Sequence, residues 1–127
     1  MRVLTKDEIL ATELETKVID VPEWYGSVRV KVMNGVERDA FDKWLSSKPA
    51  ENVMDGMKVR VCALCIVDED GNRMFTDDDI QELQKKSGAA LSRIFTIAQE
   101  MNYLLAGSIE EASGESEPEQ NGDSSSG

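Results

Sequence analysis

The spacing of apolar residues in the first third of the chain predicts an antiparallel hairpin. Apolar and basic residues alternate over residues 28–32, which is typical of a half-buried strand. The apolar stretch before them ends at Pro22, which has no backbone amide proton to donate to a strand ladder, and Gly26 allows a turn. We therefore predict strands over residues 17–21 and 27–33.

A helix-start signal precedes this hairpin. Thr5 and Glu8 have the spacing of a capping box, in which each side chain accepts a hydrogen bond from the backbone amide of the other residue. Leu4 and Ile9 occupy the positions of a hydrophobic staple around the same cap. We predict a short helix over residues 6–14.

Apolar residues at helical spacing indicate three further helices. One covers residues 35–46, with charged residues on its opposite face. The next is capped by Thr76 and Asp79, covers residues 77–86 and is broken by a Ser-Gly pair. The last helix ends near Gly107. Its apolar face is formed by Leu91, Ile94, Phe95, Ala98, Met101 and Leu105.

The apolar run at residues 54–66 fits two structures. Alternate positions are apolar, as in a strand, but an apolar stripe at helical spacing is also present. Periodicity alone does not separate a helix from a strand in such a run, so both remain open at this point. The Asp70-Gly71 pair that follows is typical of a tight turn.

The charged residues divide the chain into two parts. The 127 residues suffice for one domain, and the formal net charge is −11. Residues 108–127 hold six of the 25 acidic residues and none of the 14 basic ones, with few apolar side chains. We therefore predict an α+β fold, a small and predominantly helical single domain over residues 1–107 with an N-terminal β-hairpin, followed by a disordered acidic tail.

The charge and hydropathy of the chain also exclude classes of partner. A net charge of −11 repels phosphate backbones, so we expect no nucleic-acid binding. No apolar run reaches the roughly 18 residues of a membrane span. The first residues lack the basic-then-apolar pattern of a secretory signal. We expect no membrane contact, and a reducing cytoplasm as the location.

The candidate chemical motifs are better explained by structure than by catalysis. Cys62 and Cys65 form a C-x-x-C pair, but the chain has no His and no third Cys to complete a zinc site, and the pair lies in an apolar stretch. An EF-hand with Gly71 at its sixth position would put apolar Ile66 at the first ligand and Asp77 at the twelfth. We therefore predict buried structural cysteines, no metal, no cofactor, no catalytic residues and no enzymatic activity.

Four aromatic residues are the candidate protein-binding residues. Trp24 and Tyr25 are adjacent in the predicted hairpin turn, so one of them is expected to face outward. The alternative is that Trp24 packs on the core and Tyr25 lies flat on the surface. Phe41 and Trp44 lie on a predicted amphipathic helix, and exposed aromatic side chains often anchor interfaces. For these two, core packing is the competing interpretation.

The order and spacing of these features resemble the tail assembly chaperone family of long-tailed (siphovirus-like) bacteriophages and prophages. The resemblance covers essentially residues 1–107 and is strongest at residues 61–75. The matching segments are Leu4–Leu14, Val21-Pro22-Glu23-Trp24, Val30-Lys31-Val32, Asn34–Phe41, Val61–Phe75, Thr76–Ile80, Leu83, Lys86-Ser87, Leu91, Phe95 and Met101-Asn102.

The resemblance implies a function in phage tail morphogenesis. Members of the family bind and solubilise the long, helical tape measure protein and help recruit the major tail protein. The resemblance also implies self-association, a location in the host bacterial cytoplasm and absence from the mature virion. A longer form made by ribosomal frameshifting would begin where residues 108–127 lie. By the same analogy we favour a helix for residues 54–66.

Two other functions are compatible with the sequence. One is a small structural phage protein, such as a head–tail connector. The other is an acidic inhibitor that mimics DNA and blocks a host protein. The position of the charge weighs against the inhibitor, because more than half of the net charge lies in the tail rather than on a folded face.

Overall fold

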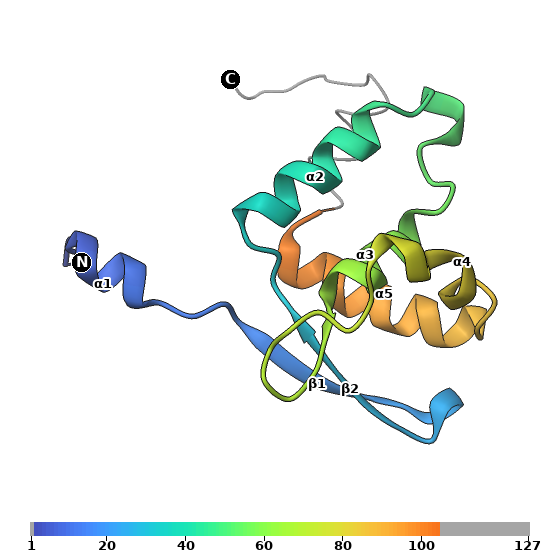
Figure 1. Ribbon diagram of the computed structural model, residues 1–127, viewed down its shortest axis with the longest axis horizontal. Helices are drawn as coiled ribbons and strands as arrows, with labels where there is room; N and C mark the ends of the chain where they lie inside the picture. Colours follow the sequence, from blue (N-terminus) through green and yellow to red (C-terminus); the bar gives the residue numbers. More distant parts are fainter. Residues whose placement is uncertain (1, 105–127) are drawn as a thin grey trace.

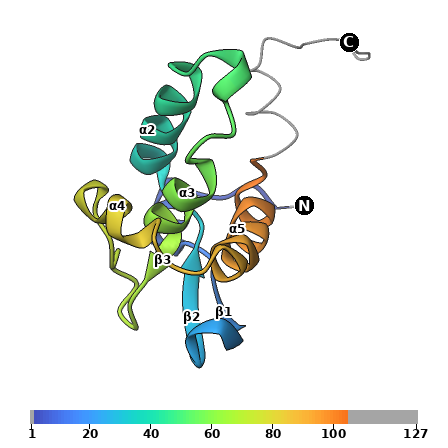
Figure 2. The ribbon, with the colours of Figure 1, turned by 90° about the vertical axis from the view of Figure 1, so that its right-hand side faces the viewer.

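The computed structural model describes residues 2–104 (Figure 1). At their centre lies one buried helix, α3 (Met57–Cys65), and other helices pack around it. Seven of the nine side chains of α3 are buried. In Figure 2, α5 (Gly88–Asn102) lies on one side of α3, and α2 (Gly35–Ser46) and α4 (Ile80–Leu83) lie on the other. A helix with so few polar positions, here Lys58 and Arg60, is stable mainly in an interior, so α3 fixes the centre of the fold.

A three-stranded antiparallel sheet packs against α5 (Figure 1). Its order is β1 (Thr16–Val21), β2 (Gly26–Lys31) and β3 (Ile66–Val67). Ile19 of β1 lies opposite Val28 of β2, so apolar residues of both strands share the face that meets the helices. The predicted hairpin is confirmed, and a short third strand extends it.

The turn of the hairpin differs from the prediction. Gly26 was expected to allow the turn, but it already pairs with Val21 as the first residue of β2. Pro22–Trp24 form a 3-10 turn, η1, and Tyr25 takes the left-handed conformation with a φ of 58°. The reversal needs a residue with positive φ, and Tyr25 supplies it although a glycine follows directly.

Local caps set the ends of the first two helices. In α1 (Lys6–Ala11) the predicted capping box is present, since the Glu8 amide donates to Thr5 Oγ1 at 3.2 Å and the Thr5 amide donates to Glu8 Oε1 at 2.9 Å. The helix ends before the predicted residue 14 because Thr12 is already extended and no side chain of α1 is buried. α2 spans the predicted residues 35–46.

The helix predicted over residues 77–86 is shorter and begins differently. Its first turn is a 3-10 turn, η3 (Asp77–Asp79), and α4 ends at Leu83, the one residue of α4 that is buried. A further 3-10 turn, η2 (Ala50–Asn52), lies between α2 and α3. Few buried side chains hold the segment from Asp77 to Leu83, so its cap and its turns determine where the helix begins and ends.

The last helix also ends earlier than predicted. α5 stops at Asn102 because Tyr103 takes a left-handed conformation with a φ of 54°, whereas the predicted end was Gly107. Residues 105–127 lie outside the described part of the chain. The predicted domain end at residue 107 and the predicted tail over residues 108–127 are therefore not covered by the structure.

The apolar run at residues 54–66, which fitted both a helix and a strand, contains a helix and the start of a strand. It is helical as α3 up to Cys65, as the family resemblance favoured, and continues as strand β3 from Ile66. The core around it draws on every main element except α1. The predicted fold class, a small and mostly helical domain with an N-terminal β-hairpin, is confirmed for residues 2–104.

Candidate functional site

The four aromatic residues singled out from the sequence lie at two separate places. Trp24 and Tyr25 are in the turn between β1 and β2, whereas Phe41 and Trp44 are on α2 and face α3. Tyr25 is 97% exposed, and Phe41 is 1% exposed and part of the core. The four residues therefore do not form one site.

The first place is a shallow hollow beside the hairpin turn, which we call the hairpin corner. Trp24 is half-buried there and packs against the core, as its alternative interpretation predicted. Tyr25 does not lie flat on the surface, because an exposure of 97% means that it projects into solvent. The hollow has a volume of about 530 Å³ and is lined by Glu23, Trp24, Tyr25, Phe75, Asp79, Glu82, Leu83 and Lys86.

An ion pair holds the hairpin corner against α5. Arg93 donates from Nη2 to Glu23 Oε2 at 2.9 Å and from Nε to Glu23 Oε1 at 3.2 Å. The hydrogen bond from Arg93 lowers the pKa of the Glu23 carboxyl below its ordinary value. This two-point contact ties the turn η1 to α5.

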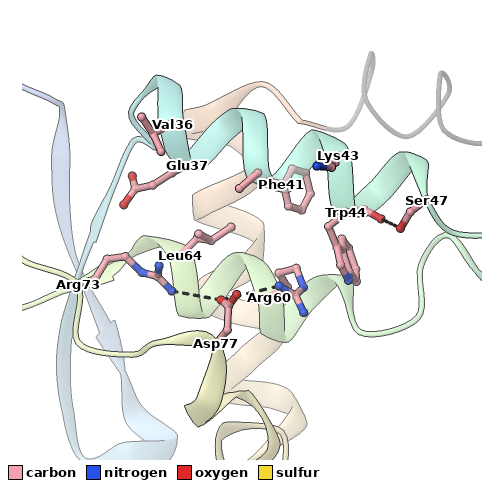
Figure 3. Close-up of a pocket in the computed structure, with 11 residues that line it drawn as sticks. Val36, Glu37, Phe41, Lys43, Trp44, Ser47, Arg60, Leu64, Arg73 and Asp77 are labelled. Carbon is pink, nitrogen blue, oxygen red and sulfur yellow. Dashed lines mark hydrogen bonds and ion pairs between the residues drawn. The ribbon is translucent and has the colours of Figure 1, made fainter.

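The second place is a groove between α2 and α3, which we call the α2–α3 groove (Figure 3). Its volume is also about 530 Å³. The apolar part comes mainly from α2, which also contributes Glu37 and Lys43, and the other charged side chains come from α3 and the segment after β3. The lining residues are Val36, Glu37, Ala40, Phe41, Lys43, Trp44, Ser47, Arg60, Leu64, Arg73 and Asp77.

Trp44, in the wall of this groove, is in cation–π contact with two basic side chains. The guanidinium carbon of Arg60 lies 4.6 Å from the centre of the Trp44 ring, and Lys48 Nζ lies 4.9 Å from it. The ring of Phe41 is 6.0 Å away at an interplanar angle of 32°. These contacts fix the orientation of the indole and leave Trp44 only partly buried.

The guanidinium groups in the α2–α3 groove are incompletely paired. Figure 3 shows Asp77 between Arg60 and Arg73, with Oδ1 3.9 Å from Arg60 Nη1 and 3.9 Å from Arg73 Nη2. Among the described residues, Arg60 Nε and Arg73 Nη2 are buried without a hydrogen-bond acceptor. Both nitrogens are enclosed by surrounding atoms, and Asp77 at 3.9 Å compensates only part of the positive charge of the two guanidinium groups.

The two cysteines are buried, as predicted, and are poor nucleophiles. Burial raises the pKa of the Cys62 thiol to about 12 and that of the Cys65 thiol to about 12. Both therefore stay protonated at neutral pH, which disfavours thiolate chemistry and metal binding. Within residues 2–104, no three His, Cys, Asp or Glu side chains gather into a potential metal site. No helix in that range has both the length and the hydropathy to cross a bilayer.

The sequence interpretation missed two polar residues, Arg60 in the α2–α3 groove and Asn102 in the core. Arg60 is one of two cations, with Lys58, in an apolar run, and this pattern could have drawn attention to it. Asn102 had no comparable signal. It is 4% exposed, accepts a hydrogen bond from the Met33 amide at 2.8 Å and donates one to the Ala98 carbonyl at 2.8 Å. Its role depends on a contact between residues far apart in the chain.

Comparison with known proteins identifies the fold. No model of a known protein family and no curated protein sequence matches the chain. Among solved structures, the tail assembly chaperone of bacteriophage HK97 matches with a TM-score of 0.55 and 17% sequence identity. The match covers 75% of this chain and 90% of the HK97 protein. The chain therefore shares its fold with a bacteriophage tail assembly chaperone.

Proposed function

We propose that this protein is a phage tail assembly chaperone that binds the tape measure protein and keeps it soluble during tail morphogenesis. The observation that carries the proposal is the fold, which matches 90% of the HK97 tail assembly chaperone. In this proposal the protein acts in the host bacterial cytoplasm, self-associates, and is absent from the mature virion. A frameshifted longer form helps to recruit the major tail protein.

The hairpin corner supports a role in binding a client. Tyr25 presents a nearly complete aromatic surface to solvent, and the hollow beside it exposes parts of Trp24 and Phe75. Aromatic side chains supply much of the binding energy at protein interfaces. A long helical client with repeated apolar positions fits a small corner of this kind, because many copies can each bind one turn of the client.

The test is co-expression with the tape measure protein, followed by measurement of the soluble client and by pull-down. We expect the client to become soluble only when this chain is present. A Tyr25→Asn variant should recover much less client, while Tyr103→Asn should recover as much as wild type. Tyr103 is the matched control, because it is 86% exposed and also has a positive φ of 54°.

Two outcomes would count against the proposal. If the client stays insoluble and unbound in the presence of wild-type protein, the chaperone function is wrong. If the protein is found in purified phage particles in stoichiometric amounts, a structural role such as a head–tail connector replaces it. Recovery of as much client by Tyr25→Asn as by Tyr103→Asn would instead show that Tyr25 is not part of the contact surface.

A further inference from the structure

We propose that the N-terminal arm of one copy, residues 2–15, docks in the α2–α3 groove of a second copy. The inference rests on the proposed function and deepens it, because it names the surfaces through which copies of the chaperone contact one another. Two features that the isolated chain leaves unexplained, an unpacked apolar arm and an apolar groove in which cations outnumber carboxylates, are explained together.

The arm has apolar side chains but no packing partner in its own chain. Figure 1 shows α1 projecting away from the rest of the molecule, and every residue from 2 to 18 is exposed. Leu10 is 71% exposed and Ile9 is 53% exposed, although both are large and apolar. Leu4 and Leu14 are 48% and 45% exposed. A run of exposed apolar residues of this kind marks an interaction site.

The arm is prepared for docking by its own polar contacts. An isolated helix shorter than about 12 residues is marginal in water, and α1 has only six residues. Arg2 Nη1 donates to both carboxylate oxygens of Glu8, at 2.7 Å and 2.8 Å, while Glu8 also completes the capping box with Thr5. These contacts hold the helical conformation and leave its apolar side chains free to pack on another surface.

The charges of the arm complement those of the groove. The arm carries four acidic residues, Asp7, Glu8, Glu13 and Glu15, against two basic ones, Arg2 and Lys6. The α2–α3 groove is lined by three cations, Lys43, Arg60 and Arg73, and by two carboxylates, Glu37 and Asp77. Because Glu37 is already paired with Lys31, the groove has an excess of positive charge, which an acidic, apolar segment complements.

The direction of the arm favours a second copy over the arm's own groove. The Glu15 carbonyl accepts a hydrogen bond from the Val32 amide at 3.0 Å, so the chain is held beside the sheet up to this residue. Beyond it, the arm runs away from the body (Figure 1). Because the arm and the groove are different surfaces, each copy that donates an arm still offers its groove, and contacts of this kind add copies head to tail.

Charge reversal at both surfaces of the full chain tests the inference. The arm variant is Asp7→Lys with Glu13→Lys, and the groove variant is Lys43→Glu with Arg60→Glu. We expect each variant to weaken self-association at least about tenfold in sedimentation velocity over a concentration series. The chain that carries all four changes should associate again, because its reversed arm meets a reversed groove. A purely structural effect of the substitutions would not be rescued in this way.

Two controls separate charge pairing from loss of fold. Glu69→Lys with Asp70→Lys makes the same change of charge as the arm variant, but in an exposed turn, and should leave association unchanged. Leu10→Ser removes an exposed apolar side chain, which cannot disturb the core, and should also weaken association. Circular dichroism and thermal unfolding of each variant establish that it is folded before its association is measured.

The outcomes that overturn the inference are distinct from those that overturn the proposed function. A wild-type chain that stays monomeric, as it would if the arm occupied its own groove, overturns the inference. So does association that persists in the arm variant, or the absence of rescue in the fourfold variant. If the groove variant loses client binding but still self-associates, the α2–α3 groove binds the client rather than the arm of a second copy. Solubility of the client with wild-type protein, measured in parallel, tests the chaperone function alone.

Discussion

At the residue scale, Tyr25 is in a conformation that favours a different residue. Its φ of 58° is strained for a side chain with a Cβ atom, and its exposure of 97% means that packing does not repay the strain. Asn tolerates this conformation better, so Tyr25→Asn should raise the free energy of unfolding by up to about 1 kcal/mol. Urea unfolding followed by circular dichroism measures the change.

The same variant separates stability from function. Tyr103→Asn should be stabilised to a similar degree, since its φ is 54°, but only the Tyr25 substitution should lower client recovery. A Tyr25→Asn protein that is less stable than wild type would show that the tyrosine contributes to the fold. Strain at an exposed aromatic residue would then not indicate function here.

Asn102 is the residue whose loss should damage the fold most clearly. Its side chain joins the end of α5 to the backbone of Met33, between β2 and α2, and its own carbonyl accepts a hydrogen bond from Arg38 Nη1 at 2.9 Å. Asn102→Leu leaves the buried Met33 amide without its acceptor and should lower the free energy of unfolding by about 2–4 kcal/mol. Glu100→Leu, on an exposed position of the same helix, should change it by less than about 0.5 kcal/mol. Equal effects in chemical denaturation would contradict this role for Asn102.

The buried thiols predict how stability depends on pH. The pKa of each thiol is raised to about 12 in the folded chain, from an ordinary value of 9.0. A raised folded pKa favours the protonated fold, so the stabilisation is present below pH 9 and is lost as the pH rises toward 12. Between pH 8 and 10 the loss should be about 1 kcal/mol for each thiol.

A thiol-free variant isolates this contribution from other titrating groups. Cys62→Ala with Cys65→Ala should be less stable at pH 8, because both thiols are fully buried, but its stability should fall less steeply toward pH 10. Urea midpoints at several pH values measure the two slopes. Parallel slopes in the two proteins would show that the thiols do not couple to folding.

At the scale of elements, local signals and tertiary packing contributed differently to each helix. Apolar residues at helical spacing predicted α2 to the residue, and in the structure Asn34 and Glu37 cap it. Periodicity left α3 undecided, because a helix with seven of nine side chains buried has too few polar positions to reveal its period. The sequence overestimated the helix after Thr76, where the cap was correct but packing ends after Leu83.

The arm is an element that contributes little to the stability of the domain. Since none of the side chains of α1 is buried, deletion of residues 1–14 should change the free energy of unfolding of the monomer by less than about 0.5 kcal/mol. Asn34→Ala, which removes the cap of the packed helix α2, should cost about 1 kcal/mol and serves as the comparison. Thermal unfolding of dilute samples, where association is minimal, gives both values. A large loss on deletion of the arm would mean that it packs on its own domain in solution.

At the scale of the whole molecule, the candidate surfaces were less accessible to prediction than the fold. Side-chain type alone selected Tyr25, which is 97% exposed, together with Phe41, which is almost completely buried. The α2–α3 groove combines Arg60 of α3 with Arg73 and Asp77 from the segment after β3. A linear sequence does not state which of its separated charges converge, so this site required the three-dimensional arrangement.

One core connects the two ends of the molecule, and this predicts a single cooperative unfolding transition. Trp24, in the hairpin turn, and Trp44, on α2, both pack against the same apolar cluster. The single-tryptophan variants Trp44→Phe and Trp24→Phe each retain one fluorescent reporter, at opposite places in the fold. Although the two variants can differ in stability, the fluorescence midpoint of each should coincide with its own circular dichroism midpoint. A fluorescence transition for Trp24 at lower urea than loss of helix would show that the hairpin unfolds separately. The described residues would then form two cooperative units rather than the single domain that the sequence predicted.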